Sequence, residues 1–122
     1  SVALIELFAG AGGFRRGCEL VGLHIAVHAV VERAITAEAV LQHRWPEALV
    51  VKTIDEAKSS FPPFLRLKGC HLKHVLIAVR CPVAMVQGLT GEKGRYEMSL
   101  ELGKVSGLAE HLRFCLPHVI VY

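Results

Sequence analysis

The residues ALIELFAGAGGFRRGCELVGL, from Ala3 to Leu23, decide the fold. An apolar run ends at Phe8, the next turn carries Gly10, Gly12 and Gly13, and an amphipathic stretch begins directly after it. This order predicts a strand, a glycine turn and a helix. Glycines in such a turn let the backbone approach a ligand, and the helix N–H groups point toward it. Their G-x-G-G spacing differs from the G-x-G-x-x-G of nicotinamide enzymes. An ordinary strand-to-helix connection explains the turn equally well at this point.

A second apolar run, HIAVHAVVE, extends from His24 to Glu32 and ends in a carboxylate. In a β-α-β unit this acid falls at the end of the second strand, where a carboxylate can accept hydrogen bonds from ribose hydroxyls. The alternative is a solvated acid at the start of a helix, where acids are favoured. Because the glycine turn precedes it, we favour a nucleoside-binding role for Glu32.

The rest of the chain alternates strands with helices, which predicts an α/β fold with a parallel sheet and right-handed crossovers. The predicted strands are Ala3–Phe8, His24–Val31, Ala48–Val51, Val75–Val79 and a last strand that begins at His118. The predicted helices are Phe14–Val21, which Gly22 closes, Ala34–His43 and Met98–Cys115. The predicted loops are Ser59–Pro63 and Pro82–Gly94, and Phe64–Lys73 is either a loop or a short helix.

Length and composition limit the class of protein. The chain has 122 residues, enough for one small domain, and 52% of them are hydrophobic. Strands buried under helices on both faces give such a composition, and so does a piece of a larger protein. The final LPHVIVY stops inside an apolar run, so we expect a fragment. A net charge of +3 permits a polyanionic partner without requiring one.

The cysteines and histidines do not predict a metal site. The four cysteines form no C-x-x-C pair, which argues against structural zinc. His24 and His28 share a face of a predicted strand, and His71 lies near His74, but no carboxylate or cysteine completes either set. There is no signal peptide and no apolar run of membrane-spanning length. We therefore expect an intracellular protein without metal or membrane contact, nuclear if eukaryotic and otherwise cytoplasmic.

The sequence resembles the DNA (cytosine-5) methyltransferases, which bind S-adenosylmethionine. The segment ELFAGAGGFRRGCELVG is similar to their first motif, with Phe8, Gly10, Gly12 and Gly13 on its F-x-G-x-G-G core. The segment VVERAITAEAVLQHRWPE is similar to the second motif, and Glu32 falls on the acid that holds the ribose. The final HVIVY resembles the strand that leads into an E-N-V motif, although the sequence stops before that Glu.

The resemblance implies a Rossmann-like S-adenosylmethionine-dependent methyltransferase fold that is incomplete here. Residues 1–122 would be the N-terminal, cofactor-binding part of a catalytic domain, DNA would be the partner, and the target-recognition domain would be absent. The implied cofactor-binding residues are Phe8, Ala9, Gly10, Gly12, Gly13, Glu32 and Asp55. The family has an Asp after the third strand, near the adenine amine. Asp55 can fill this role although strict alignment reaches Thr53, and the alternative for Asp55 is to cap a helix.

The chain departs from the family at the catalytic loop. In the family, the cysteine of a Pro-Cys-Gln motif attacks C6 of a flipped-out cytosine, the Glu of E-N-V holds N3, and C5 takes the methyl group. Here the loop reads RCPVAMVQGLTGEKG. Alignment on Pro82 puts Val83 at the nucleophile position and Ala84 at the glutamine position. Cys81 is the candidate nucleophile only if the register shifts by two residues, which proline resists. Otherwise Cys81 is a small buried hydrophobe.

Three functional hypotheses follow. The first is a methyltransferase-like domain that binds S-adenosylmethionine and is inactive alone because Val83 replaces the nucleophile. The second is a non-catalytic module that binds cofactor or partners. The third is another nucleoside-binding α/β enzyme that shares only the first motif.

Overall fold

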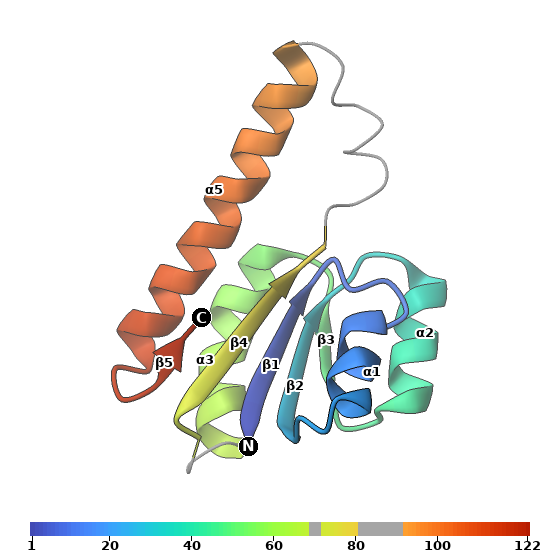
Figure 1. Cartoon of the computed structure of the whole chain (residues 1–122). Coiled ribbons are helices and arrows are strands. Elements are labelled where there is room, and N and C mark those ends of the chain that lie inside the picture. Colours follow the sequence, from blue (N-terminus) through green and yellow to red (C-terminus); the bar gives the residue numbers. More distant parts are fainter. Residues whose placement is uncertain (69–71, 81–91) are drawn as a thin grey trace.

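A parallel sheet forms the centre of the computed structural model, which describes residues 1–68, 72–80 and 92–122 (Figure 1). Within them the strands are β1 (Val2–Leu7), β2 (Ile25–Val31), β3 (Leu49–Val51), β4 (His74–Val79) and β5 (Ile120–Val121). The helices are α1 (Gly13–Leu20), α2 (Ile35–Arg44), α3 (Ile54–Lys68) and α5 (Glu92–Cys115). The five strands lie in the order β3-β2-β1-β4-β5, and every neighbouring pair is parallel. The predicted α/β class is confirmed, with a Rossmann-like general shape.

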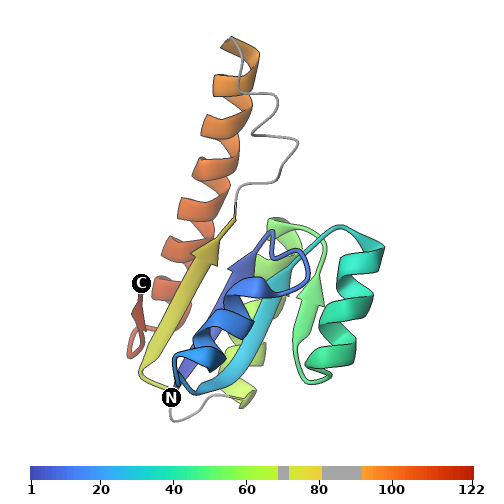
Figure 2. The same cartoon turned by 45° about the vertical axis from the view of Figure 1, so that its right-hand side comes forward.

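Helices cover both faces of this sheet (Figures 1 and 2). Ala3, Ile5 and Leu7 of β1 pack in one cluster with residues of α3 and α5. Leu4 packs on the opposite face with Cys18 of α1. Because both faces of β1 are covered, its sequence is an almost unbroken apolar run rather than an alternating one.

The order of the strands creates a topological switch point beside β1. The chain runs from β1 outward to β2 and β3, and then returns to place β4 on the other side of β1. Ligands of open α/β sheets bind outside the carboxyl ends of the strands at such a point. The glycine turn follows β1 directly, so it lies at this edge.

Local sequence fixes the two ends of α1. Gly12 is the N-cap residue, with a left-handed φ of 85°. At the other end Gly22 has a φ of 83°, its N–H donates to the Glu19 carbonyl at 3.1 Å, and the Leu23 N–H donates to the Cys18 carbonyl at 2.9 Å. These two bonds form a Schellman motif, which confirms Gly22 as the residue that closes the helix.

The loop predicted over Ser59–Pro63 is wrong, because α3 continues through Pro62 and Pro63. Proline at position 62 cannot donate to the Lys58 carbonyl four residues earlier. His111 of α5 donates to that carbonyl instead, from Nε2 at 2.9 Å. The tertiary contact thus satisfies the group that the proline leaves without a donor.

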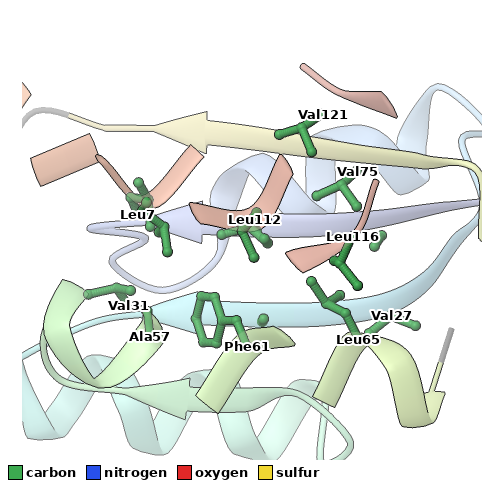
Figure 3. Packing of buried hydrophobic residues seen from close by; sticks show 14 of the residues in the cluster. Leu7, Val27, Val31, Ala57, Phe61, Leu65, Val75, Leu112, Leu116 and Val121 are labelled. Atoms are coloured by element: carbon green, nitrogen blue, oxygen red, sulfur yellow. The ribbon is translucent and has the colours of Figure 1, made fainter. Parts of the chain in front are cut away.

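Burial also holds α3 together across its prolines. Its side chains Ala57, Phe61 and Leu65 lie in the main core with Leu112 of α5 and Leu116, which directly follows α5 (Figure 3). Phe61 is fully buried. Burying such side chains stabilises the fold by about 1.5–3 kcal/mol each, enough to outweigh the weak local preference for a helix.

The other boundaries differ little from those predicted. The last strand begins at Ile120 rather than His118, and α5 begins at Glu92 rather than Met98, so the end of the predicted Pro82–Gly94 loop is helical. Within the described ranges, no helix has the length and apolar character needed to cross a membrane.

Candidate functional site at the glycine turn

The turn after β1 has an unusual backbone. Phe8 has a positive φ of 60°, and Gly10 follows with a φ of 58°. An aromatic residue rarely adopts this conformation, which is strained for a side chain with a Cβ. The Phe8 N–H donates to the Val31 carbonyl at 2.8 Å, so pairing with the end of β2 holds the strained residue in place. Such strain concentrates at functional sites.

Glu32 joins the turn to the start of α2. Its Oε2 accepts a hydrogen bond from the Gly10 N–H at 2.9 Å, and its Oε1 accepts one from the Ala34 N–H at 3.3 Å. The structure thus brings together the glycine and the acid that the sequence placed in one site. The carboxylate is half-buried, and each oxygen keeps a further lone pair. A hydroxyl group of a ligand can therefore still donate to it.

The three glycines of the turn have different surroundings. A Cβ added to Gly10 would lie 2.9 Å from Nη1 of Arg80. A Cβ on Gly12 would collide with the ring of Trp45 and lie 2.9 Å from Cδ2 of Leu41. A Cβ on Gly13 would meet no atom of the described residues within 4 Å. Gly12 is therefore required by internal packing, whereas Gly13 leaves open space over the backbone.

The first turn of α1 favours an anionic group. Gly12 supplies no side-chain cap, and there is no acid in the first turn. The backbone N–H groups and the positive end of the helix dipole can then act on a ligand acceptor.

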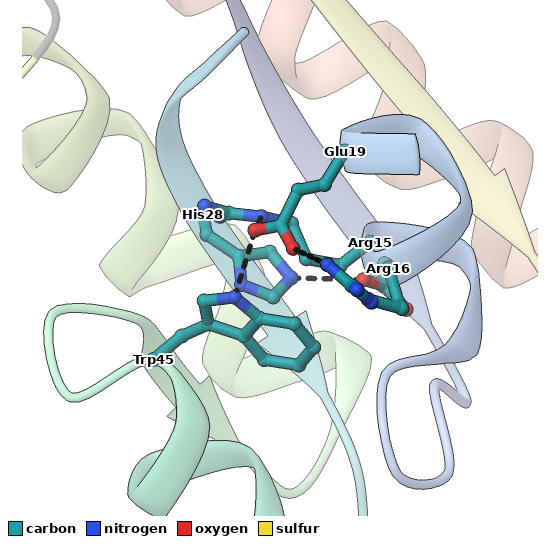
Figure 4. Close-up of polar contacts among 6 residues, drawn as sticks. Arg15, Arg16, Glu19, His28 and Trp45 are labelled. Atoms are coloured by element: carbon teal, nitrogen blue, oxygen red, sulfur yellow. Dashed lines mark hydrogen bonds and ion pairs between the residues drawn. The ribbon is translucent and has the colours of Figure 1, made fainter. Parts of the chain in front are cut away.

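A polar network lies beside the turn, between the sheet and the helices α1 and α2 (Figure 4). Glu19 accepts hydrogen bonds from Arg15 Nε at 2.9 Å and from the Trp45 indole N–H at 3.0 Å. The Arg15 guanidinium, followed by the Trp45 hydrogen bond, holds the pKa of Glu19 below its ordinary value. Trp45 also meets the His28 ring edge to face, with the ring centroids 5.6 Å apart. The network therefore fixes α1 against the end of α2.

A buried acid–imidazole pair completes this network. His28 Nε2 lies 2.9 Å from Glu6 Oε1, and both side chains are almost fully buried. The other ring nitrogen, Nδ1, has no hydrogen-bond partner in the described part of the chain. The sequence did not point to Glu6, although an acid inside an apolar strand indicates a buried partner.

The histidines do not assemble a metal site in the described residues. Glu6 pairs with His28, whereas His24 precedes β2 and bonds through Nδ1 to the Ser1 hydroxyl at 2.8 Å. No group of three or more possible ligands occurs in residues 1–68, 72–80 and 92–122 as far as they are described.

Asp55 follows β3, which β2 separates from β1 in the sheet. It is exposed in the first turn of α3, after the carboxyl end of β3. Thr53 rather than Asp55 caps this helix, because the Thr53 hydroxyl accepts the Glu56 N–H at 3.1 Å. The capping alternative for Asp55 is therefore wrong, and its assignment to the adenine amine stays a prediction.

The catalytic candidate lies outside the described residues, as do Val83 and Ala84. Cys81 would follow Arg80, the last described residue after β4. Cys18 is not a substitute nucleophile, because burial raises the pKa of its thiol and favours the unreactive neutral form.

Described residues of the sheet and its helices line two of the cavities. One of about 250 Å³ is lined by Arg15, the start of β2, the end of α2 with Trp45, and the end of α3. Another of about 220 Å³ is lined by the end of α3, by β4 with Leu72 before it, and by the segment that connects α5 to β5. Trp45, whose ring lies against Gly12, links the first of these cavities to the glycine turn.

Comparison with known protein families gives no matching family, and comparison with curated proteins gives no similar sequence. The functional argument therefore depends on the motif residues and on the geometry of the turn.

Proposed function

We propose that the glycine turn binds S-adenosylmethionine, in a domain of the DNA (cytosine-5) methyltransferase type. The observation that carries this proposal is the hydrogen bond from Gly10 to Glu32. It joins the two motifs on which the resemblance depends, at the edge of the sheet where such folds bind ligands.

Each part of the turn has a role in this proposal. Glu32 accepts hydrogen bonds from the ribose hydroxyls, and the open backbone at Gly13 lets the ligand come close. The uncapped first turn of α1 attracts the negatively charged end of the cofactor. Phe8 and Ala9 form the wall between the turn and the core, and Asp55 is the candidate for the adenine amine.

When bound, S-adenosylmethionine would supply an electrophilic methyl group. The partner would be DNA, as in the family that the motifs resemble. We propose that this chain does not transfer the methyl group, because Val83 stands where the family has its cysteine. A valine side chain has no atom that can attack C6 of cytosine.

The loss of the nucleophile also favours a second candidate function, a non-catalytic module that binds the cofactor or partners without turnover. Transfer of labelled methyl groups to DNA separates the candidates when Val83→Cys is compared with the unchanged sequence, both in a full-length context. Activity gained by Val83→Cys would indicate an enzyme disabled by one substitution, whereas no gain would support the non-catalytic module. Transfer by the unchanged chain would contradict the proposed inactivity.

Calorimetric titration with S-adenosylhomocysteine tests cofactor binding. We expect the folded chain to bind it, and Glu32→Ala to weaken binding at least about tenfold, since hydrogen bonds to charged groups contribute roughly 1.5–3 kcal/mol. Gly13→Ala is the sharper variant, because its added methyl group meets no atom of the described residues within 4 Å but would obstruct the ligand. Glu110→Ala, an exposed acid on α5, is the matched control for lost charge.

Titrations with ATP and NAD test the third hypothesis. A folded chain that binds either nucleotide but not S-adenosylhomocysteine would replace the methyltransferase proposal with another nucleoside-binding enzyme. A folded chain that binds none of them would leave the partner-binding module as the better explanation.

A further inference from the structure

We infer that Arg80 recognises a carboxylate of the ligand, so that the glycine turn selects nucleosides that carry an amino-acid tail over nucleosides that lack one. This inference rests on the proposed function and names a specificity residue that the family motifs do not contain.

Arg80 and the glycine turn lie on the two sides of the topological switch point, after β4 and after β1. It directly follows β4, and its backbone N–H donates to the Leu7 carbonyl at the end of β1, at 3.0 Å. This bond extends the pairing of β1 with β4 by one residue, so the start of the Arg80 side chain is fixed by the sheet. The carboxyl ends of β1 and β4 therefore present Arg80 and the turn to the same space.

The side chain of Arg80 reaches over Gly10. A Cβ at position 10 would lie only 2.9 Å from Arg80 Nη1, which is closer than real Cβ atoms approach other atoms. The absence of a side chain at Gly10 therefore lets the guanidinium lie against the backbone of the turn. The same glycine donates its N–H to Glu32. Gly10 therefore lies between the cationic guanidinium of Arg80 and the anionic carboxylate of Glu32.

The guanidinium is available for a ligand. Arg80 is exposed and forms no ion pair with the described residues. By contrast, Arg15 and Arg16, which begin α1 after the turn, both pair with Glu19. An arginine fork binds a carboxylate through two parallel hydrogen bonds. Arg80, which pairs with no acid of the described residues, is therefore suited to a carboxylate of the ligand.

The two charged groups define the ligand between them. Glu32 is an acceptor and selects hydroxyl donors, whereas Arg80 is a donor and selects an anionic acceptor. A ligand that satisfies both must carry a hydroxylated part and a carboxylate. A nucleoside with an amino-acid tail fulfils this requirement, and a simple nucleoside fulfils only half of it.

The test compares two ligands by calorimetry: S-adenosylhomocysteine, and 5′-methylthioadenosine, which lacks the amino-acid tail. We expect Arg80→Gln to weaken the binding of S-adenosylhomocysteine about tenfold, which is the effect of one lost charge-assisted hydrogen bond. The same substitution should leave the binding of 5′-methylthioadenosine unchanged. Arg80→Lys should bind S-adenosylhomocysteine more weakly than the unchanged chain and more tightly than Arg80→Gln, because lysine keeps the charge but not the two-pronged geometry of the guanidinium. The control is Lys73→Gln, an exposed cation at the opposite end of β4.

The outcomes separate this inference from the proposed function. If the unchanged chain binds both ligands equally, or if Arg80→Gln weakens both or neither, the role of Arg80 is wrong while cofactor binding stands. If the folded chain binds neither ligand, the proposed function fails and the role of Arg80 fails with it.

Discussion

Alanine substitutions at the adjacent glycines Gly12 and Gly13 should have opposite effects on stability. Gly12 has a left-handed φ of 85°, which costs a residue with a Cβ about 1–2 kcal/mol. Its new methyl group would also collide with Trp45 and approach Leu41 Cδ2 to 2.9 Å, and such overpacking costs about 1–3 kcal/mol. We therefore expect Gly12→Ala to lower the free energy of unfolding by about 2–5 kcal/mol.

Gly13→Ala is the internal control for this prediction. The added methyl group meets no described atom within 4 Å, and alanine favours the helix by about 0.5 kcal/mol. Urea unfolding measures both variants through the fluorescence of Trp45, the single tryptophan of the chain. At an unchanged m-value of about 1–3 kcal/mol/M, the midpoint of Gly12→Ala should fall by roughly 1 M or more. An unchanged midpoint would mean that Trp45 does not pack on the glycine turn, and would refute the network beside it.

Three further predictions concern stability and reactivity. His111→Ala should lower the free energy of unfolding by about 1 kcal/mol, because it leaves the partly buried Lys58 carbonyl without a donor. Adding Pro62→Ala should recover part of this loss in urea unfolding, because residue 62 then supplies its own N–H, and a purely additive double variant would argue against the compensation. The pKa of Glu19 is lowered, chiefly by Arg15, so the stability that its carboxylate contributes is present above the ordinary pKa of 4.5 and is lost as the pH falls through the pKa of the folded state. Glu19→Gln should remove that part of the acid dependence of unfolding. Because burial raises the pKa of Cys18, alkylation of this thiol in the folded chain, followed by mass spectrometry, should be slow at neutral pH. The stability that the neutral thiol contributes should decline as the pH rises above 9.0. Alkylation of Cys18 at the rate of the unfolded chain would contradict its burial.

The parts of the fold that local sequence specifies could be predicted. The glycine turn, the amphipathic segment after it and Gly22 identify α1 through contacts among neighbouring residues. The contact between Gly10 and Glu32 also follows from sequence order, because both residues lie just after adjacent parallel strands. Its bonding pattern does not, since the carboxylate also accepts the Ala34 N–H.

The remaining features depend mainly on contacts between residues that are distant in the sequence. Nothing near Pro62 indicates that His111, in another helix, provides a donor for the orphan carbonyl. Arg80 is one of many scattered cations until the sheet places it over the turn. The capping of α3, by contrast, has a local signal, because Thr53 and Glu56 have the spacing of a capping box.

The central position of β1 also determines when the sheet can close during synthesis. Of the two strands that pair with β1, β2 is synthesised first, after one short helix, whereas β4 comes only with residues 74–79. A growing chain therefore carries β1 with one unpaired edge while α2, β3 and α3 are made. Unpaired edges of apolar strands recruit other strands, and non-local parallel pairing is slow. We expect the nascent chain to need protection from aggregation until residue 79 has left the ribosome.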